Sequence, residues 1–158
     1  MADDDNGGRL DRELGELLQE LRVALPGVQV LFAFLLTIPF AQRFTTITSS
    51  QKTAYFIAFL STAAATALLI APSAHHRIRW RQGDKEQLLR TASKFTLAGL
   101  AFLTVAMAST VFVVTDVLYD TTWAVLIAVA TGLVFVLLWF TLPAGWHILR
   151  RPPAGPRG

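Results

Sequence analysis

The chain alternates between long apolar stretches and short charged ones. Four stretches contain no Asp, Glu, Lys or Arg, and they cover residues 23–42, 53–74, 95–115 and 121–149. A helix of roughly 20 apolar residues is long enough to cross a hydrocarbon layer about 30 Å thick. The pattern therefore predicts an all-α integral membrane bundle of four transmembrane helices, with spans at about 23–42, 53–72, 95–117 and 122–143.

The segment before the first span has a different pattern. Leucines recur there at helical spacing on one face and charged or amide side chains occupy the other, which predicts an amphipathic cytoplasmic helix at 9–22. Residues 1–8 are acidic and contain glycine, so we expect a disordered tail. Because proline lacks a backbone N–H, we expect the amphipathic helix to bend at Pro26 as it enters the first span.

The acidic face of this amphipathic helix has two candidate environments. Anionic lipid repels carboxylates, so Glu13, Glu16 and Glu20 are poorly suited to lie on a membrane surface. The face could pack near the arginines that follow the second span, Arg77, Arg79 and Arg81. Alternatively it is a solvated acidic face, because exposed ion pairs contribute little stability.

The later boundaries of the membrane domain are marked by capping and turn residues. Asp84 is a good N-cap and Gln87 follows it three residues later, which predicts a helix that runs from Lys85 to about Val117. The four-span domain then extends over 23–149. The proline- and glycine-rich residues 150–158 are expected to form a disordered tail.

Composition and charge support a membrane protein with a defined orientation. The 158 residues are 53% hydrophobic and 16% charged, and the net charge of +3 comes from basic residues at the ends of apolar spans. We therefore expect no nucleic-acid partner. Six Lys or Arg residues follow the second span and three follow the fourth, an excess that is typical of cytoplasmic segments. This excess predicts a multi-pass cell-membrane protein with both termini in the cytoplasm.

Small residues indicate where the helices pack. In lipid, helices associate through close contact of small side chains. The second span has many of these, including Ala63 and Ala67, and the fourth span carries Ala124, Ala128 and Gly132 at four-residue spacing. We expect these faces to pack within the bundle, against a second copy of the chain or against another membrane protein.

Few strongly polar side chains fall inside the spans. Asp116 lies near the outer boundary of the third span, and Gln29 lies about two turns inside the first. Both residues form the candidate polar or ion site, because ionisable groups within a membrane often serve transport. The alternatives are an interfacial carboxylate for Asp116 and an interhelical hydrogen bond for Gln29.

A repeated motif follows two of the spans. The pattern P-x3-H-x2-R occurs as Pro72, His76 and Arg79 and again as Pro143, His147 and Arg150. Together with the adjacent His75 and Arg77, these residues could bind an anionic lipid headgroup or titrate near neutral pH. The simpler interpretation is that proline ends each span and interfacial polar residues follow it.

No motif indicates catalysis, a metal or a cofactor. The chain has no cysteine, no glycine-rich phosphate loop, no nucleophile elbow and no metallohydrolase His/Glu pair. We expect no enzyme activity, although an enzyme acting on lipid would depend on His75, His76 or His147. We likewise expect no metal site and no cofactor.

Two sequence runs support a family resemblance. Residues 16–40, ELLQELRVALPGVQVLFAFLLTIPF, and 68–77, LLIAPSAHHR, resemble a family of small uncharacterised four-span membrane proteins typical of actinobacteria. The likeness covers about 10–114, and its most specific part is the Leu-Pro-Gly-x-Gln stretch. Some members are labelled automatically as sodium:proton antiporters, so the resemblance implies four spans and, through that label, cation exchange.

The charge-free spans and the charge-dense inner face together predict a function in association. The leading interpretation is a non-enzymatic inner-membrane module, with the lipid bilayer as its environment, that oligomerises or binds another membrane protein. The alternative is a cation/proton antiporter or channel component. That alternative rests on Asp116, the paired histidines and the family label.

Overall fold

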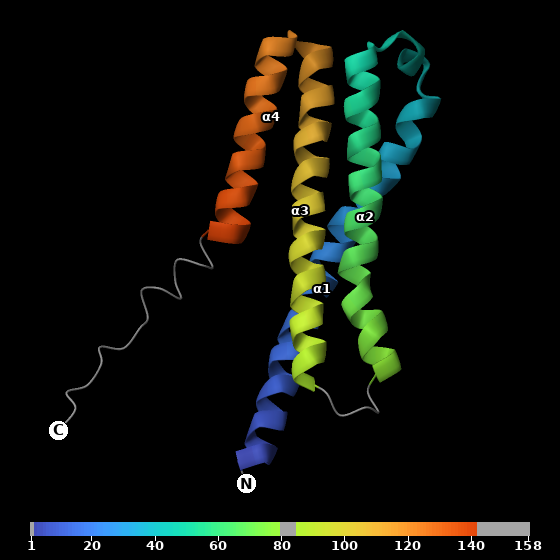
Figure 1. Ribbon diagram of the computed structural model, residues 1–158. Helices are drawn as coiled ribbons and strands as arrows, with labels where there is room; N and C mark the ends of the chain where they lie inside the picture. The colour runs from blue at the N-terminus through green and yellow to red at the C-terminus, as the bar shows by residue number, and fades with distance from the viewer. Residues whose placement is uncertain (1, 80–84, 142–158) are drawn as a thin grey trace, which may run out of the picture.

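The computed structural model describes residues 2–79 and 85–141. Four long helices make up most of this part of the chain, α1 (Ala2–Thr37), α2 (Ser49–Arg79), α3 (Lys85–Leu118) and α4 (Thr121–Val136) (Figure 1). Short 3-10 helices η1 (Ile38–Phe40) and η2 (Gln42–Thr46) connect α1 to α2, and a π-helical turn, η3 (Leu137–Thr141), extends α4.

The predicted fold class is confirmed. Four segments are long and apolar enough to cross a membrane, Gly15–Phe40, Ser49–Ser73, Leu89–Leu118 and Thr121–Thr141. They correspond to the four charge-poor blocks of the sequence, and they leave most of their large apolar side chains on the outside of the bundle. Such a surface suits a hydrocarbon environment, where apolar side chains need not be buried.

The N-terminal part of the chain differs from the expectation. One helix begins at Ala2 and continues through Pro26, in place of a disordered tail and a separate amphipathic helix that bends into the span. Leu21 and Val28 are both buried on the same face, so packing holds the helix in one direction on either side of Pro26.

The core lies between α2 and α3, which run side by side along the middle of the molecule with α1 crossing them (Figure 1). Seven of the buried positions of α2 alternate in spacing between four and three residues, and they are Gln51, Tyr55, Ala58, Thr62, Ala65, Leu69 and Pro72; Ser61, beside Thr62, is buried as well. This is the spacing of a helix that packs along a neighbour in a left-handed crossing. The Thr62 hydroxyl donates to the Ala58 carbonyl at 2.7 Å, so its burial leaves no donor unsatisfied.

Gly99 permits a close contact between these two helices. A Cβ atom at this position would lie 2.8 Å from Cγ and Cδ2 of Leu69, which is fully buried on α2. Real Cβ contacts are longer than this, so a larger residue would require the Leu69 side chain or one of the two helices to shift. Glycine therefore fits this position in the core between α2 and α3.

Helix α4 is the least buried of the four. It lies beside α3, on the side away from α2 (Figure 1), and Ala124 is its only buried residue. Its start is fixed by Asp120, whose Oδ1 accepts hydrogen bonds from the backbone N–H of Thr122 at 2.9 Å and of Trp123 at 3.2 Å. Among the described residues, one flank of α4 remains open.

Candidate functional site

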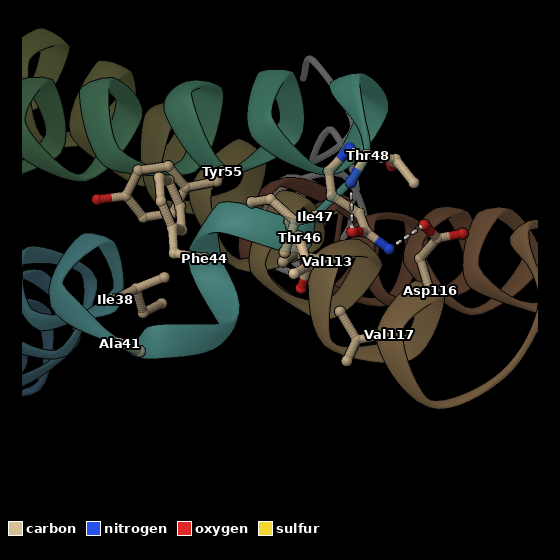
Figure 2. Close-up of a pocket in the computed structure, with 11 residues that line it drawn as sticks. Ile38, Ala41, Phe44, Thr46, Ile47, Thr48, Tyr55, Val113, Asp116 and Val117 are labelled. Carbon is tan, nitrogen blue, oxygen red and sulfur yellow. Dashed lines mark hydrogen bonds between the residues drawn. The ribbon is translucent and has the colours of Figure 1, made fainter.

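A pocket that contains a carboxylate lies at the end of the bundle where α1 connects to α2 and α3 connects to α4. We call it the Asp116 pocket; its volume is about 350 Å³. Its walls are largely apolar and come from η1, η2 and α3, with Ile38, Phe44 and Val113 among them (Figure 2). Gln51 and Asp116 supply its strongly polar side chains.

The orientation of Gln51 follows from the way α2 begins. Thr48 precedes the helix, and its Oγ1 accepts a hydrogen bond from the Gln51 backbone N–H at 3.2 Å. The Thr48 backbone N–H in turn donates to Oε1 of Gln51 at 3.0 Å. This reciprocal pair is a capping box, which satisfies two backbone donors at the start of a helix. Because Oε1 faces a donor, the amide nitrogen of Gln51 must point the other way.

That nitrogen meets the carboxylate of Asp116, 65 residues further along the chain. Nε2 of Gln51 donates to Oδ2 of Asp116 at 2.8 Å (Figure 2), and Gln51 itself is only 7% exposed. The carboxylate also lies beside the N-terminal turn of α2, whose dipole favours negative charge. The other oxygen, Oδ1, is buried and has no hydrogen-bond partner among the described residues. A buried carboxylate oxygen without a donor is rare and indicates a water, an ion or a functional role.

Tyr55 forms a second polar contact between helices near the pocket. Its hydroxyl donates to the Leu35 carbonyl of α1 at 2.8 Å, and the bond is buried. In a regular helix that carbonyl would accept from the residue four positions later, but this residue is Pro39, which has no N–H. Tyr55 therefore supplies the donor that Pro39 lacks. Its ring also packs edge-on against Phe44 of η2, with 5.3 Å between the ring centroids.

The two residues of the predicted polar site are not brought together. Asp116 lines the pocket, whereas Gln29 is exposed on α1 and is not part of the lining. The residue that partners Asp116 is Gln51, which is not among the predicted site residues. The available signal was the T-x-x-Q capping pattern at 48–51, which fixes a glutamine side chain at the start of a span.

The residues predicted for helix packing take different positions. Ala124 is fully buried, and Ala128 and Gly132 line a second cavity between α2, α3 and α4. On α2, Ala63 is half-buried and Ala67 is exposed. The small side chains that α2 buries within the described part of the chain are instead those of Ala58, Ser61, Thr62 and Ala65.

The histidine and arginine motif lies largely outside the described part of the chain. Helix α2 extends to Arg79, but the side chains of His75, His76, Arg77 and Arg79 are not described, and neither are His147 and Arg150. Arg81, the other expected neighbour of the acidic face, is likewise outside the described residues.

Within that face, Oε1 of Glu13 accepts from Nε of Arg9 at 2.9 Å, an exposed pair one helical turn apart. The hydrogen bond and charge of Glu13 raise the pKa of Arg9 above its ordinary value.

The described residues contain no group of three or more His, Cys, Asp and Glu side chains that could hold a metal ion. The chemistry of the Asp116 pocket is therefore that of one carboxylate with one amide partner, in a largely apolar wall. Such a site can hold a positive charge or exchange a proton. It contains no nucleophile paired with a base among the residues that line it.

Comparison with known proteins gives one match. No curated protein and no solved structure is similar to this chain. A family model described as a family of unknown function (DUF6328) matches residues 3–143, which include α1, α2, α3, α4 and the Asp116 pocket. The chain therefore belongs to the DUF6328 family, and it has the four long apolar helices of a membrane protein.

Proposed function

We propose that this protein is a non-enzymatic membrane module that associates with a second copy of itself through an open groove beside α4. The observation that carries the proposal is this groove, the second cavity described above, which has a volume of about 510 Å³. The excess of Lys and Arg after the second and fourth spans supports an orientation with both termini in the cytoplasm.

The groove has the lining of a helix-packing site. Its small side chains come from all three helices that border it, namely Ala54 of α2, Ala108 of α3, and Ala128 and Gly132 of α4. Hydroxyls of Thr104 and Ser109 lie among them. Small and hydroxyl side chains allow transmembrane helices to approach closely, which is the main source of their association in lipid. A lipid tail fills such a groove less completely than a helix does.

The occupant we propose is α4 of the second copy. Thr121–Thr141 is the only one of the four spans without a charged residue, so it can enter an apolar groove without burying an unpaired charge. It is also the span with the least surface buried within its own chain. In a two-fold symmetric dimer, α4 of each copy would lie in the groove of the other copy, so both grooves are filled in the same way.

Ser109→Phe is expected to weaken this association, because a phenylalanine side chain would occupy the groove that the second copy fills. We expect the dissociation constant of the dimer in mild detergent to rise by about tenfold or more, since a clash at a packed helix interface costs on the order of 1–3 kcal/mol. Analytical ultracentrifugation of the purified full-length protein measures this constant.

Val30→Phe provides the matched control. Val30 is exposed on α1 and does not line the groove, so the same aromatic ring there should leave the dissociation constant unchanged. A strictly monomeric wild-type protein, or a dimer that is equally stable in the Ser109→Phe variant, would contradict the proposal.

A second candidate function is that of a cation/proton antiporter or channel component. The buried Oδ1 of Asp116, which has no partner among the described residues, supports it, because ionisable groups are costly inside a membrane and often mark ion pathways. If the chain conducts protons, reconstituted vesicles should acidify faster than empty ones under an imposed gradient, and Asp116→Asn should abolish the difference. Equal rates with and without wild-type protein would remove this candidate.

A further inference from the structure

We propose that the Asp116 pocket is a binding site for an amphipathic organic cation, a small ammonium compound with an apolar body. The inference concerns a different part of the molecule from the groove beside α4 and does not depend on self-association. It rests on the charge, the size and the lining of the pocket.

The charge of the pocket favours a cation. Asp116 is the only Asp or Glu in the spans Ser49–Ser73, Leu89–Leu118 and Thr121–Thr141. One of its oxygens accepts from Gln51, and the other is buried without a partner among the described residues. An ammonium group next to this carboxylate would offset the cost of the buried charge.

The lining argues against a bare metal ion as the ligand. Calcium takes about six to eight oxygen ligands and magnesium requires a complete octahedron. In this pocket, however, Oε1 of Gln51 and Oγ1 of Thr48 already accept hydrogen bonds within the capping box. Asp116 is the only carboxylate among the residues that line the pocket, which suits a monovalent ammonium better than an ion that needs a full coordination shell.

The size and shape of the pocket match a small organic molecule. Its volume of about 350 Å³ is roughly ten times that of one water molecule and falls within the range of ligand pockets. Asp116 lies on one side, and Phe44 and Ile38 lie on the other (Figure 2). A ligand can therefore place its charge at Asp116 and its apolar body among the aliphatic and aromatic side chains.

The position of the pocket allows such a ligand to arrive through the membrane. Asp116 lies two residues before the end of α3, close to the end of its span. Amphipathic cations concentrate at this depth, with the ammonium near the lipid headgroups and the apolar part among the acyl chains. The pocket has the same polarity, from the carboxylate to the apolar wall.

Calorimetric titration of the full-length protein in mild detergent tests the proposal, with benzyltrimethylammonium chloride as the probe. We expect saturable binding to the wild-type protein and binding at least about tenfold weaker to Asp116→Asn, which keeps the acceptor for Gln51 but loses the charge. Asp120→Asn is the matched control. Asp120 caps α4 and does not line the pocket, and asparagine caps a helix equally well, so binding should be unchanged.

Two further measurements separate the charge from the apolar body. Benzyl alcohol, which has the ring without the charge, and tetramethylammonium, which has the charge without the ring, should each bind at least about tenfold more weakly than the probe. Val117→Phe fills the pocket while leaving Asp116 in place, so it should weaken probe binding to a similar extent even if Asp116→Asn fails to fold. Circular dichroism monitors the folding of each variant.

Three outcomes would overturn the proposal. The first is no saturable binding of the probe to folded wild-type protein. The second is equal binding to the wild type, Asp116→Asn and Val117→Phe, which would show association outside the pocket. The third is competition by sodium chloride at lower concentration than the probe requires, in a manner that depends on Asp116, which would assign the site to an inorganic cation.

Discussion

Replacing Tyr55 with phenylalanine is expected to lower the free energy of unfolding by about 1–3 kcal/mol, because it leaves a buried carbonyl without a donor. The ring would remain, so the edge-on contact with Phe44 and the packing of the buried side chain change little. What is lost is the hydroxyl that donates to the Leu35 carbonyl at 2.8 Å. Pro39 cannot replace it, and lipid offers no donor.

SDS titration of the detergent-solubilised protein, followed by circular dichroism and tryptophan fluorescence, measures this loss. The chain contains two tyrosines, so Tyr119→Phe makes the same chemical change at a site that is 69% exposed at the end of α3, and it should leave the unfolding transition in place. A Tyr55→Phe variant as stable as the wild type would show that the Leu35 carbonyl finds another donor.

Gly99→Ala is expected to destabilise the protein by about 1–3 kcal/mol, because the added methyl group has no room. Its Cβ would lie 2.8 Å from two carbons of Leu69, and Leu69 is fully buried, so either the Leu69 side chain leaves its packed position or the two helices move apart. Either change weakens the packing of the core between α2 and α3. The expected result is a shift of the unfolding midpoint to lower SDS concentration.

Gly27→Ala is the control for this substitution. A Cβ at Gly27 would meet nothing within 4 Å, and Gly27 lines neither the groove nor the Asp116 pocket. Both substitutions remove a glycine from an apolar span, so any gain in helix propensity is similar for the two variants. Gly27→Ala should therefore unfold within about 0.5 kcal/mol of the wild type. Equal destabilisation by both changes would contradict the close contact of Gly99.

The transmembrane helices could be predicted from the sequence because their signal lies in consecutive residues and does not depend on contacts between distant ones. Absence of charge over 20 or more residues identifies a span whatever its neighbours are. The helix expected from Lys85 to about Val117, on the signal of Asp84 and Gln87, corresponds to α3, whose described residues run from Lys85 to Leu118. The continuous helix through Pro26 was not expected, because it depends on packing of Leu21 and Val28 that no local rule describes.

The contacts between helices could not be predicted in the same way. In a helix of a soluble protein, the apolar face is the buried one. In α2 every face is apolar or made of small residues, so the sequence does not distinguish the buried Ala58 and Ala65 from Ala63 and Ala67. Similarly, nothing in the sequence connects Gln51 to Asp116, because the two residues are 65 positions apart. The polar site depends on the fold, which brings the start of α2 next to the end of α3.

The hydrogen bond between Tyr55 and Leu35 also bears on how the chain enters a bilayer. Until α2 is present, the Leu35 carbonyl would face hydrocarbon without a donor, at a cost of several kcal/mol. The first helix is therefore poorly suited to insert by itself, and α1 and α2 are favoured to partition into lipid as a preformed hairpin. Pro39, whose missing N–H leaves the Leu35 carbonyl without a donor, lies only ten residues before the start of α2. The two helices of the hairpin are therefore synthesised in close succession.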